Sequence, residues 1–108
     1  MELKELLDFI RDQDEKIKNK PVNASATRKE RVLGRTVKVT EELGELCDAI
    51  LAADGDQRKE KLEKSSKENL EGEFADVIIT TLLLAHSLGV DIEEALSKKV
   101  EMINKRHV

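Results

Sequence analysis

EFADVIITTLLLAHSL, residues 73–88, is the stretch of the chain that decides the fold. Read as a helix, it places apolar side chains on every side rather than along one stripe, for example Ile78 and Leu82 on one side and Ile79 and Leu83 on another. A helix that is apolar all round must be surrounded by other segments. The rest of a 108-residue chain can hardly enclose it, so we expect a second copy to cover the remaining face, most simply in a two-fold helical-bundle dimer.

Helix signals also account for the segments before this stretch. Apolar residues at helical spacing predict a helix over residues 2–18. Thr27 and Glu30 form a capping box that predicts a second helix from about 28 to 53, with Gly55 as its stop. Gly34 and Gly44 lie inside this helix, which we attribute to close packing against another helix.

The remaining segments complete the helical pattern. Residues 56–68 are strongly charged and predict a solvated loop or a loose helical excursion, so the apolar helix is expected from about 69 to 88, ending at Gly89. Asp91 and Glu94 form a second capping box for a last helix that runs to about Arg106. Alternating strand patterns are missing. We therefore predict an all-α single domain over 1–108, a four-to-five-helix bundle assembled as a homo-oligomer.

Composition excludes several classes of function. The net charge is −4 with acids and bases interspersed, and only Phe9 and Phe74 are aromatic, which argues against a nucleic-acid partner. The solitary Cys47 excludes an intramolecular disulfide and a multi-cysteine zinc site. The N-terminus has no apolar signal-peptide centre, and the apolar run 77–88 is too short to span a bilayer. We expect a cytoplasmic protein without a membrane partner.

Two pairs of carboxylates stand out on the two central helices. Glu42 with Glu45, and Glu73 with Asp76, are each three residues apart, so both acids of a pair share one helical face. Like charges this close repel unless a cation or a basic partner lies between them. Four oxygen-donor groups from two adjacent helices suit Mg²⁺, or Mn²⁺ in its place. Taken alone, the first pair is more often a solvated helical face, and the joint pattern is what favours a metal site.

The pattern Glu41-Glu42-x-x-Glu45, a gap of 27 residues and then Glu73-x-x-Asp76 resembles the signature of MazG-like nucleoside triphosphate pyrophosphohydrolases. The chain is similar to that family from about residue 30 to the end, in the segments KVTEELGELCDAI, EFADVIITTLLLAHSLGVDIEEAL and KKVEMINKR. The resemblance implies an Mg²⁺-dependent, all-α enzyme, a homodimer or homotetramer, that hydrolyses (deoxy)nucleoside triphosphates to monophosphate and pyrophosphate in nucleotide-pool house-cleaning.

The resemblance also assigns roles to residues. It implies that Glu42, Glu45, Glu73 and Asp76 hold the metal. Glu41 lies on a different face and is a candidate to orient water, and either it or Glu45 is a candidate general base. Candidate contacts to the substrate phosphates are Lys99, Asn104, Arg106 and, more weakly, Lys38. By spacing alone Asn104 falls on another side of its helix from Lys99, so convergence of these residues needs a bend near the C-terminus.

Other interpretations of the same residues stay open. Phosphoribosyl-ATP pyrophosphatase and dUTPase-like enzymes share the metal chemistry, and a non-catalytic helical interaction module would carry the acids without using them. A di-iron bundle is disfavoured because that site uses Glu-x-x-His pairs. His86 reads as a satisfied core or interface residue and Cys47 as core, while His107 lies in a terminus that we expect to fray.

Overall fold

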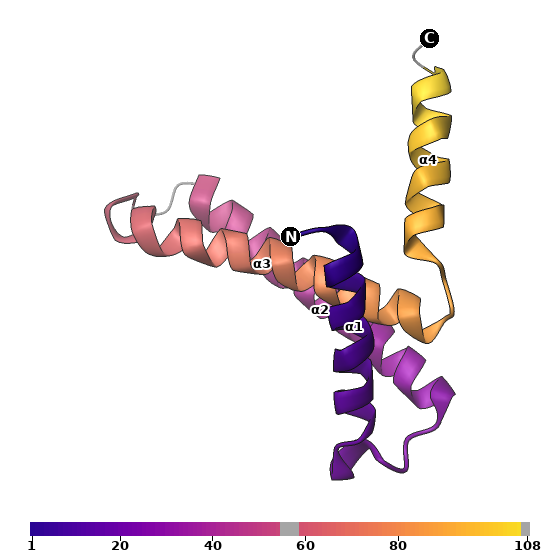
Figure 1. Ribbon diagram of the computed structural model, residues 1–108. Coiled ribbons are helices and arrows are strands. Elements are labelled where there is room, and N and C mark those ends of the chain that lie inside the picture. The colour runs from indigo at the N-terminus through magenta and orange to yellow at the C-terminus, as the bar shows by residue number, and fades with distance from the viewer. Residues whose placement is uncertain (55–58, 107–108) are drawn as a thin grey trace.

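The structure, a computed structural model, describes residues 1–54 and 59–106, with the side chains of 59–68 left aside (Figure 1). Every regular element in these two ranges is helical, which confirms the all-α class. The elements are α1 (Leu3–Lys18), a single 3₁₀ turn η1 (Pro21–Asn23), α2 (Arg28–Asp54), α3 (Lys59–Ser87) and α4 (Ile92–Arg106).

The helix ends follow the predicted capping residues. At the start of α2 the Thr27 amide donates to Glu30 Oε1 and the Glu30 amide donates to Thr27 Oγ1, both at 3.1 Å, so the predicted capping box is confirmed. At the start of α4 the Glu94 amide donates to Asp91 Oδ1 at 3.1 Å. Gly89 follows α3 with φ of 70°, a left-handed conformation that favours glycine. The predicted stop at Gly55 and the C-terminal His107 lie outside the described residues.

Three local expectations are wrong within the chain, and one of them concerns Cys47, which we expected in the core but which is exposed. Helix α3 begins at Lys59 rather than near 69, so the solvated-loop interpretation fails from residue 59 onward and the helical alternative holds. The physical reason is that Lys, Glu and Leu, which dominate 59–64, are good helix formers even without an apolar stripe. Close packing does not explain Gly34 and Gly44 within this chain, because a Cβ at either position would meet nothing within 4 Å.

Helices α2 and α3 run side by side in opposite directions and form the central hairpin of the molecule (Figure 1). Helix α1 packs across α3. Helix α4 leaves the end of α3 at 111° and extends away from the hairpin (Figure 1). The chain is an open molecule of 49 × 46 × 25 Å, because α1 and α4 project from the central hairpin (Figure 1). The hairpin holds the acidic residues of α2 opposite those of α3.

The apolar core of the described residues is small. Among the side chains that the structure describes, only Ile10, Leu46 and Ala49 are buried apolar ones, whereas Phe74 and Ile78 on the central α3 remain 48% and 52% exposed. Helix α4 leaves further apolar residues exposed, with Leu96, Val100 and Ile103 in one row and Met102 on another face. The single chain therefore leaves α3 partly open, as its all-round apolar pattern predicts, and the oligomeric state stays a prediction.

Candidate metal centre

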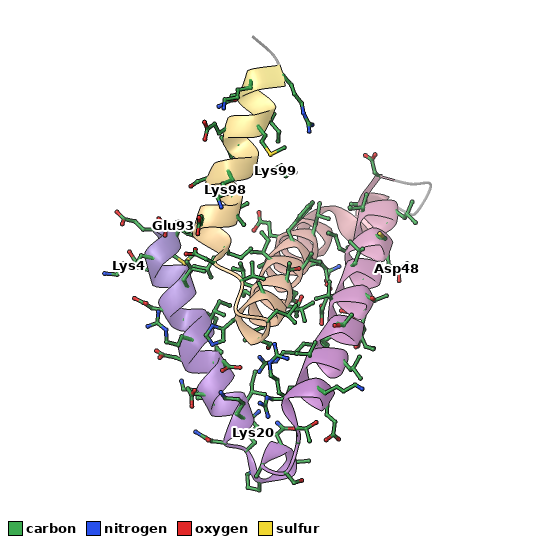
Figure 2. All side chains as sticks on the ribbon, turned by 90° about the vertical axis from the view of Figure 1, so that its right-hand side faces the viewer. Lys4, Lys20, Asp48, Glu93, Lys98 and Lys99 are labelled. Carbon is green, nitrogen blue, oxygen red and sulfur yellow. The ribbon has the colours of Figure 1, made fainter. Side chains whose placement is uncertain are left out.

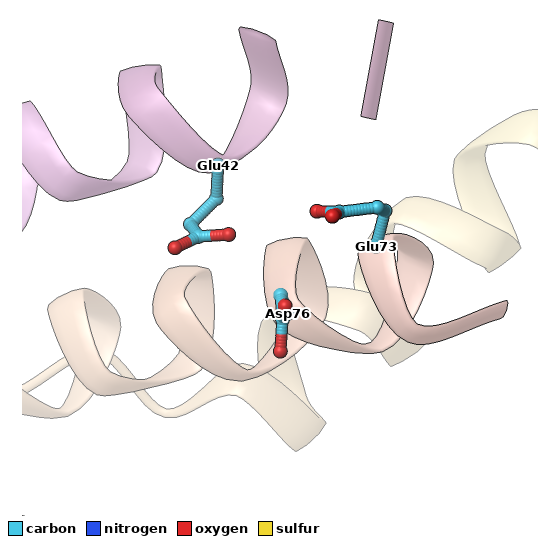
Figure 3. Close-up of side chains that lie close together, drawn as sticks. All are labelled: Glu42, Glu73 and Asp76. Carbon is cyan, nitrogen blue, oxygen red and sulfur yellow. The ribbon is translucent and has the colours of Figure 1, made fainter. Parts of the chain in front are cut away.

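The central hairpin brings together acids from both of its helices. Glu42 on α2 is buried, with 7% of its surface exposed, and it faces Glu73 and Asp76 on α3 (Figure 3). One oxygen from each of these three carboxylates lies within 4.8 Å of the others. The three residues share this site because Glu73 and Asp76 are one helical turn apart and the antiparallel α2 presents Glu42 opposite them.

The hydrogen bonding of these acids is incomplete. Among the described residues, Glu42 Oε2 and Glu73 Oε2 are buried and have no hydrogen-bond partner. Buried polar atoms are nearly always paired, and a carboxylate oxygen without a partner is costly. A divalent cation placed among the three groups would satisfy both oxygens and offset the repulsion between the charges. The donor set is entirely carboxylate oxygen, so these residues fit a hard cation such as Mg²⁺ or Mn²⁺.

Lys38 and Glu41 border the cluster on α2. Lys38 Nζ lies 3.2 Å from Glu42 Oε1 and 3.5 Å from Glu41 Oε2. The hydrogen bond with Glu42 and then the charge of Glu41 raise the pKa of Lys38, so its ammonium is kept charged. Glu41 itself is exposed and lies on a different face of α2 from Glu42, in agreement with its spacing.

Glu45 is exposed and lies one turn after Glu42 on α2, outside the group of three within 4.8 Å. Its pKa is raised, first by the negative charge of Glu42, then by desolvation and by the charge of Glu73. The charges of the cluster therefore act on the carboxylate of Glu45. The assignment of Glu45 as a metal ligand or as a general base stays a prediction.

The predicted phosphate contacts on α4 lie apart from the carboxylates. Every residue from Glu93 to Arg106 is exposed, and α4, which carries Lys99, extends away from the α2 arm that carries Asp48 (Figure 2). Asn104 lines a groove of about 550 Å³ between α4 and Leu3 at the start of α1, and Lys99 and Arg106 do not. Helix α4 is continuous to Arg106, so the bend that would make these residues converge is absent. The structure does not bring them together within one chain.

The structure contains a second polar cluster, which the sequence did not predict. Asp14 on α1 is only 4% exposed, and it accepts a 2.6 Å hydrogen bond from Arg35 Nη1 on α2. The same Nη1 donates to Ser87 Oγ on α3, and His86 Nε2 lies 3.4 Å from Asp14 Oδ2. This Asp14–Arg35 cluster joins three helices near the open end of the hairpin, where Arg35 lies about two helical turns before Glu42 on α2. Its signal in the sequence was an acid, Asp14, inside the apolar row of Ile10 and Ile17.

Burial raises the pKa of Asp14, but hydrogen bonds and charge from Arg35 and then Lys18 outweigh that effect and lower the pKa below its ordinary value of 3.8. The carboxylate is therefore ionised at neutral pH and neutralises Arg35. His86 lies in this cluster rather than at the acidic site, and because it is exposed it is not a core residue within the chain.

No single helix in the described ranges is long and apolar enough to cross a membrane. Residues Asn69–Ser87 of α3 and the whole of α4, which meet at an angle of 111°, are together long and apolar enough by length and composition alone.

Fold and site together define an all-α protein whose helical hairpin presents a carboxylate cluster suited to a divalent cation. The chain belongs to the MazG-like family, whose model matches residues 34–108, a range that contains both acid pairs and leaves out α1. Proteins of this family are typically pyrophosphohydrolases and are in general metal-dependent.

One curated relative is the uncharacterized protein YpjD of Bacillus subtilis (strain 168). It is 32% identical over 74 residues, which make up 68% of this chain and 65% of the relative. The match thus spans less than two thirds of the relative's length. No solved structure matches the chain.

Proposed function

We propose that this protein is an Mg²⁺-dependent nucleoside triphosphate pyrophosphohydrolase that releases a nucleoside monophosphate and pyrophosphate. One observation carries the proposal: Glu42, Glu73 and Asp76 converge from two helices with two buried carboxylate oxygens that lack partners among the described residues. A non-catalytic bundle gains nothing from this arrangement, since it places repelling charges at a partly buried position. A site that binds a divalent cation accounts for it.

The roles of the residues follow from their positions. Glu42, Glu73 and Asp76 would hold Mg²⁺, with Glu45 as a further ligand. When bound, the ion neutralises the triphosphate and lowers the pKa of a bound water. Glu41 and Glu45, both exposed beside the cluster, are the candidate groups to accept the proton of the attacking water.

The phosphate contacts depend on assembly. Lys38 is the cation beside the carboxylates, whereas Lys99, Asn104 and Arg106 lie on the uncovered α4. We propose a homodimer or homotetramer, because the apolar rows of α3 and α4 need a cover and a second copy supplies one. In such an assembly, α4 of the partner subunit can bring its cations to the carboxylates.

The experiment is Mg²⁺-dependent pyrophosphate release from a panel of ribo- and deoxyribonucleoside triphosphates, with dUTP and phosphoribosyl-ATP included to separate the related activities. Wild-type protein should release pyrophosphate from at least one substrate with Mg²⁺ and none with EDTA. Glu42→Gln and Asp76→Asn should both abolish release. Asp12→Asn, which removes an exposed acid on α1, a helix that gives no residue to the cluster, should retain it. Wild-type rates in either cluster variant would refute the assignment.

A further inference from the structure

Lys38 pairs with only one of the two carboxylate oxygens of Glu42. Its ammonium lies 3.2 Å from Glu42 Oε1, while Glu42 Oε2 is buried without a partner among the described residues. Lys38 also contacts Glu41 at 3.5 Å, and within the described residues it is the one basic side chain that pairs with this group of acids. The protein therefore already places a positive charge at the carboxylates before any divalent ion arrives.

The balance of charge makes this ion pair replaceable. Five carboxylates lie on or beside the cluster, Glu41, Glu42, Glu45, Glu73 and Asp76, and a single ammonium cannot neutralise them. The Lys38 side chain is 51% exposed, so it can swing into solvent without disturbing the hairpin. A compact ammonium on a flexible stem, unlike the planar fork of Arg, holds its partner through charge rather than through a fixed geometry.

We propose that Lys38 is an exchangeable stand-in cation, which pairs with Glu42 in the metal-free protein and is released when a divalent ion binds. This inference rests on the proposed function and goes beyond it, because it makes Lys38 a competitor of the metal. The repulsion between the two cations pushes the ammonium off Glu42. The freed ammonium, still beside Glu41, is then available to pair with a phosphate of the bound triphosphate.

The exchange predicts opposite effects on two affinities. Removal of the Lys38 charge removes a competitor, so the metal binds more tightly in the absence of nucleotide. The same change removes a phosphate partner, so the triphosphate binds more weakly once metal is present. A merely structural role for Lys38 would weaken both, because Glu42 would lose the contact that holds it in place.

The test uses the full chain and Mn²⁺, whose free concentration is read directly by electron paramagnetic resonance. Lys38→Met should bind Mn²⁺ on the order of tenfold more tightly than wild type in the absence of nucleotide. Lys38→Gln, which keeps a hydrogen-bond donor while losing the charge, should do the same and guards against a folding defect. Lys38→Arg keeps the charge and should bind no more tightly than wild type.

Arg11→Met is the control, since it breaks an exposed ion pair with Asp8, 3.5 Å long, on α1, a helix that gives no residue to the cluster. Its Mn²⁺ affinity should equal that of wild type. With saturating Mn²⁺, an α,β-methylene triphosphate should bind on the order of tenfold less tightly to Lys38→Met.

The failures are distinguishable. Wild-type protein that binds no Mn²⁺ would overturn the metal centre and this inference together. Wild-type binding with unchanged or weaker Mn²⁺ affinity in both neutral variants would overturn the exchange alone and leave the metal centre standing. Unchanged nucleotide affinity in Lys38→Met would overturn the transfer of the ammonium to phosphate.

Discussion

Glu73→Gln should stabilise the metal-free protein while it removes the response to Mg²⁺. Glu73 is half-buried, its Oε2 has no hydrogen-bond partner among the described residues, and it forms no ion pair there. Glu42 and Asp76 lie close to it with like charge. Neutralising Glu73 therefore relieves its repulsion with Glu42 and Asp76 without breaking a favourable contact. The same change at Glu42 would also break the ion pair with Lys38.

The size of the effect follows from the carboxylate oxygens of the three residues, which lie no more than 4.8 Å apart. Two unit charges at that separation repel by about 3.5 kcal/mol at an effective dielectric constant of about 20, and by about 0.9 kcal/mol in bulk water. Because Asp76 is exposed and Glu73 only half-buried, the value near the water limit applies. We expect Glu73→Gln to raise the free energy of unfolding by about 1 kcal/mol in EDTA.

The assay is chemical denaturation at one protein concentration, in EDTA and in excess Mg²⁺. Wild-type protein should gain about 2.7 kcal/mol when Mg²⁺ is at about 100 times its dissociation constant, and Glu73→Gln should gain close to nothing. Glu71→Gln, at an exposed acid two residues earlier on α3, is the control and should behave as wild type. A destabilised Glu73→Gln in EDTA, or one that keeps the Mg²⁺ response, would refute the reasoning.

Three further predictions concern the scaffold. Asp14→Asn leaves Arg35 buried without its counter-charge and should cost about 3 kcal/mol in denaturation at pH 7. Because the folded-state pKa of Asp14 is lowered, this contribution is present above the unfolded value of 3.8 and disappears as the pH falls through the folded value, so the two proteins should converge in acid. Thr27→Ala removes the acceptor for the Glu30 amide and should cost about 1 kcal/mol in the same assay, and an unchanged midpoint would contradict the cap. Light scattering should give a dimer or larger, and a stable monomer would contradict the packing argument.

Much of the fold was predictable because its signals are local. The capping box at Thr27, the N-cap at Asp91 and the glycine at 89 predicted helix ends within a few residues, since each depends on groups a few positions apart. The start of α3 was missed because residues 59–68 carry helix propensity without an apolar stripe, and the stripe is the signal that sequence analysis follows.

The acidic site was partly predictable for the same reason. Spacing of three residues predicts that Glu73 and Asp76 share a face, and the hairpin then brings Glu42 to them. The cluster around Asp14 and Arg35 was not predictable in this way. Its partners are 21 and 52 residues apart, so only the packing of three helices shows which polar groups meet.

The most direct test of the central claim is anomalous scattering from crystals of the wild-type protein soaked in Mn²⁺. The account predicts a manganese peak between Glu42 on α2 and Glu73 and Asp76 on α3, within coordination distance of an oxygen from each (Figure 3). An empty site with the three side chains turned apart in saturating Mn²⁺ would contradict it and leave only the all-α fold.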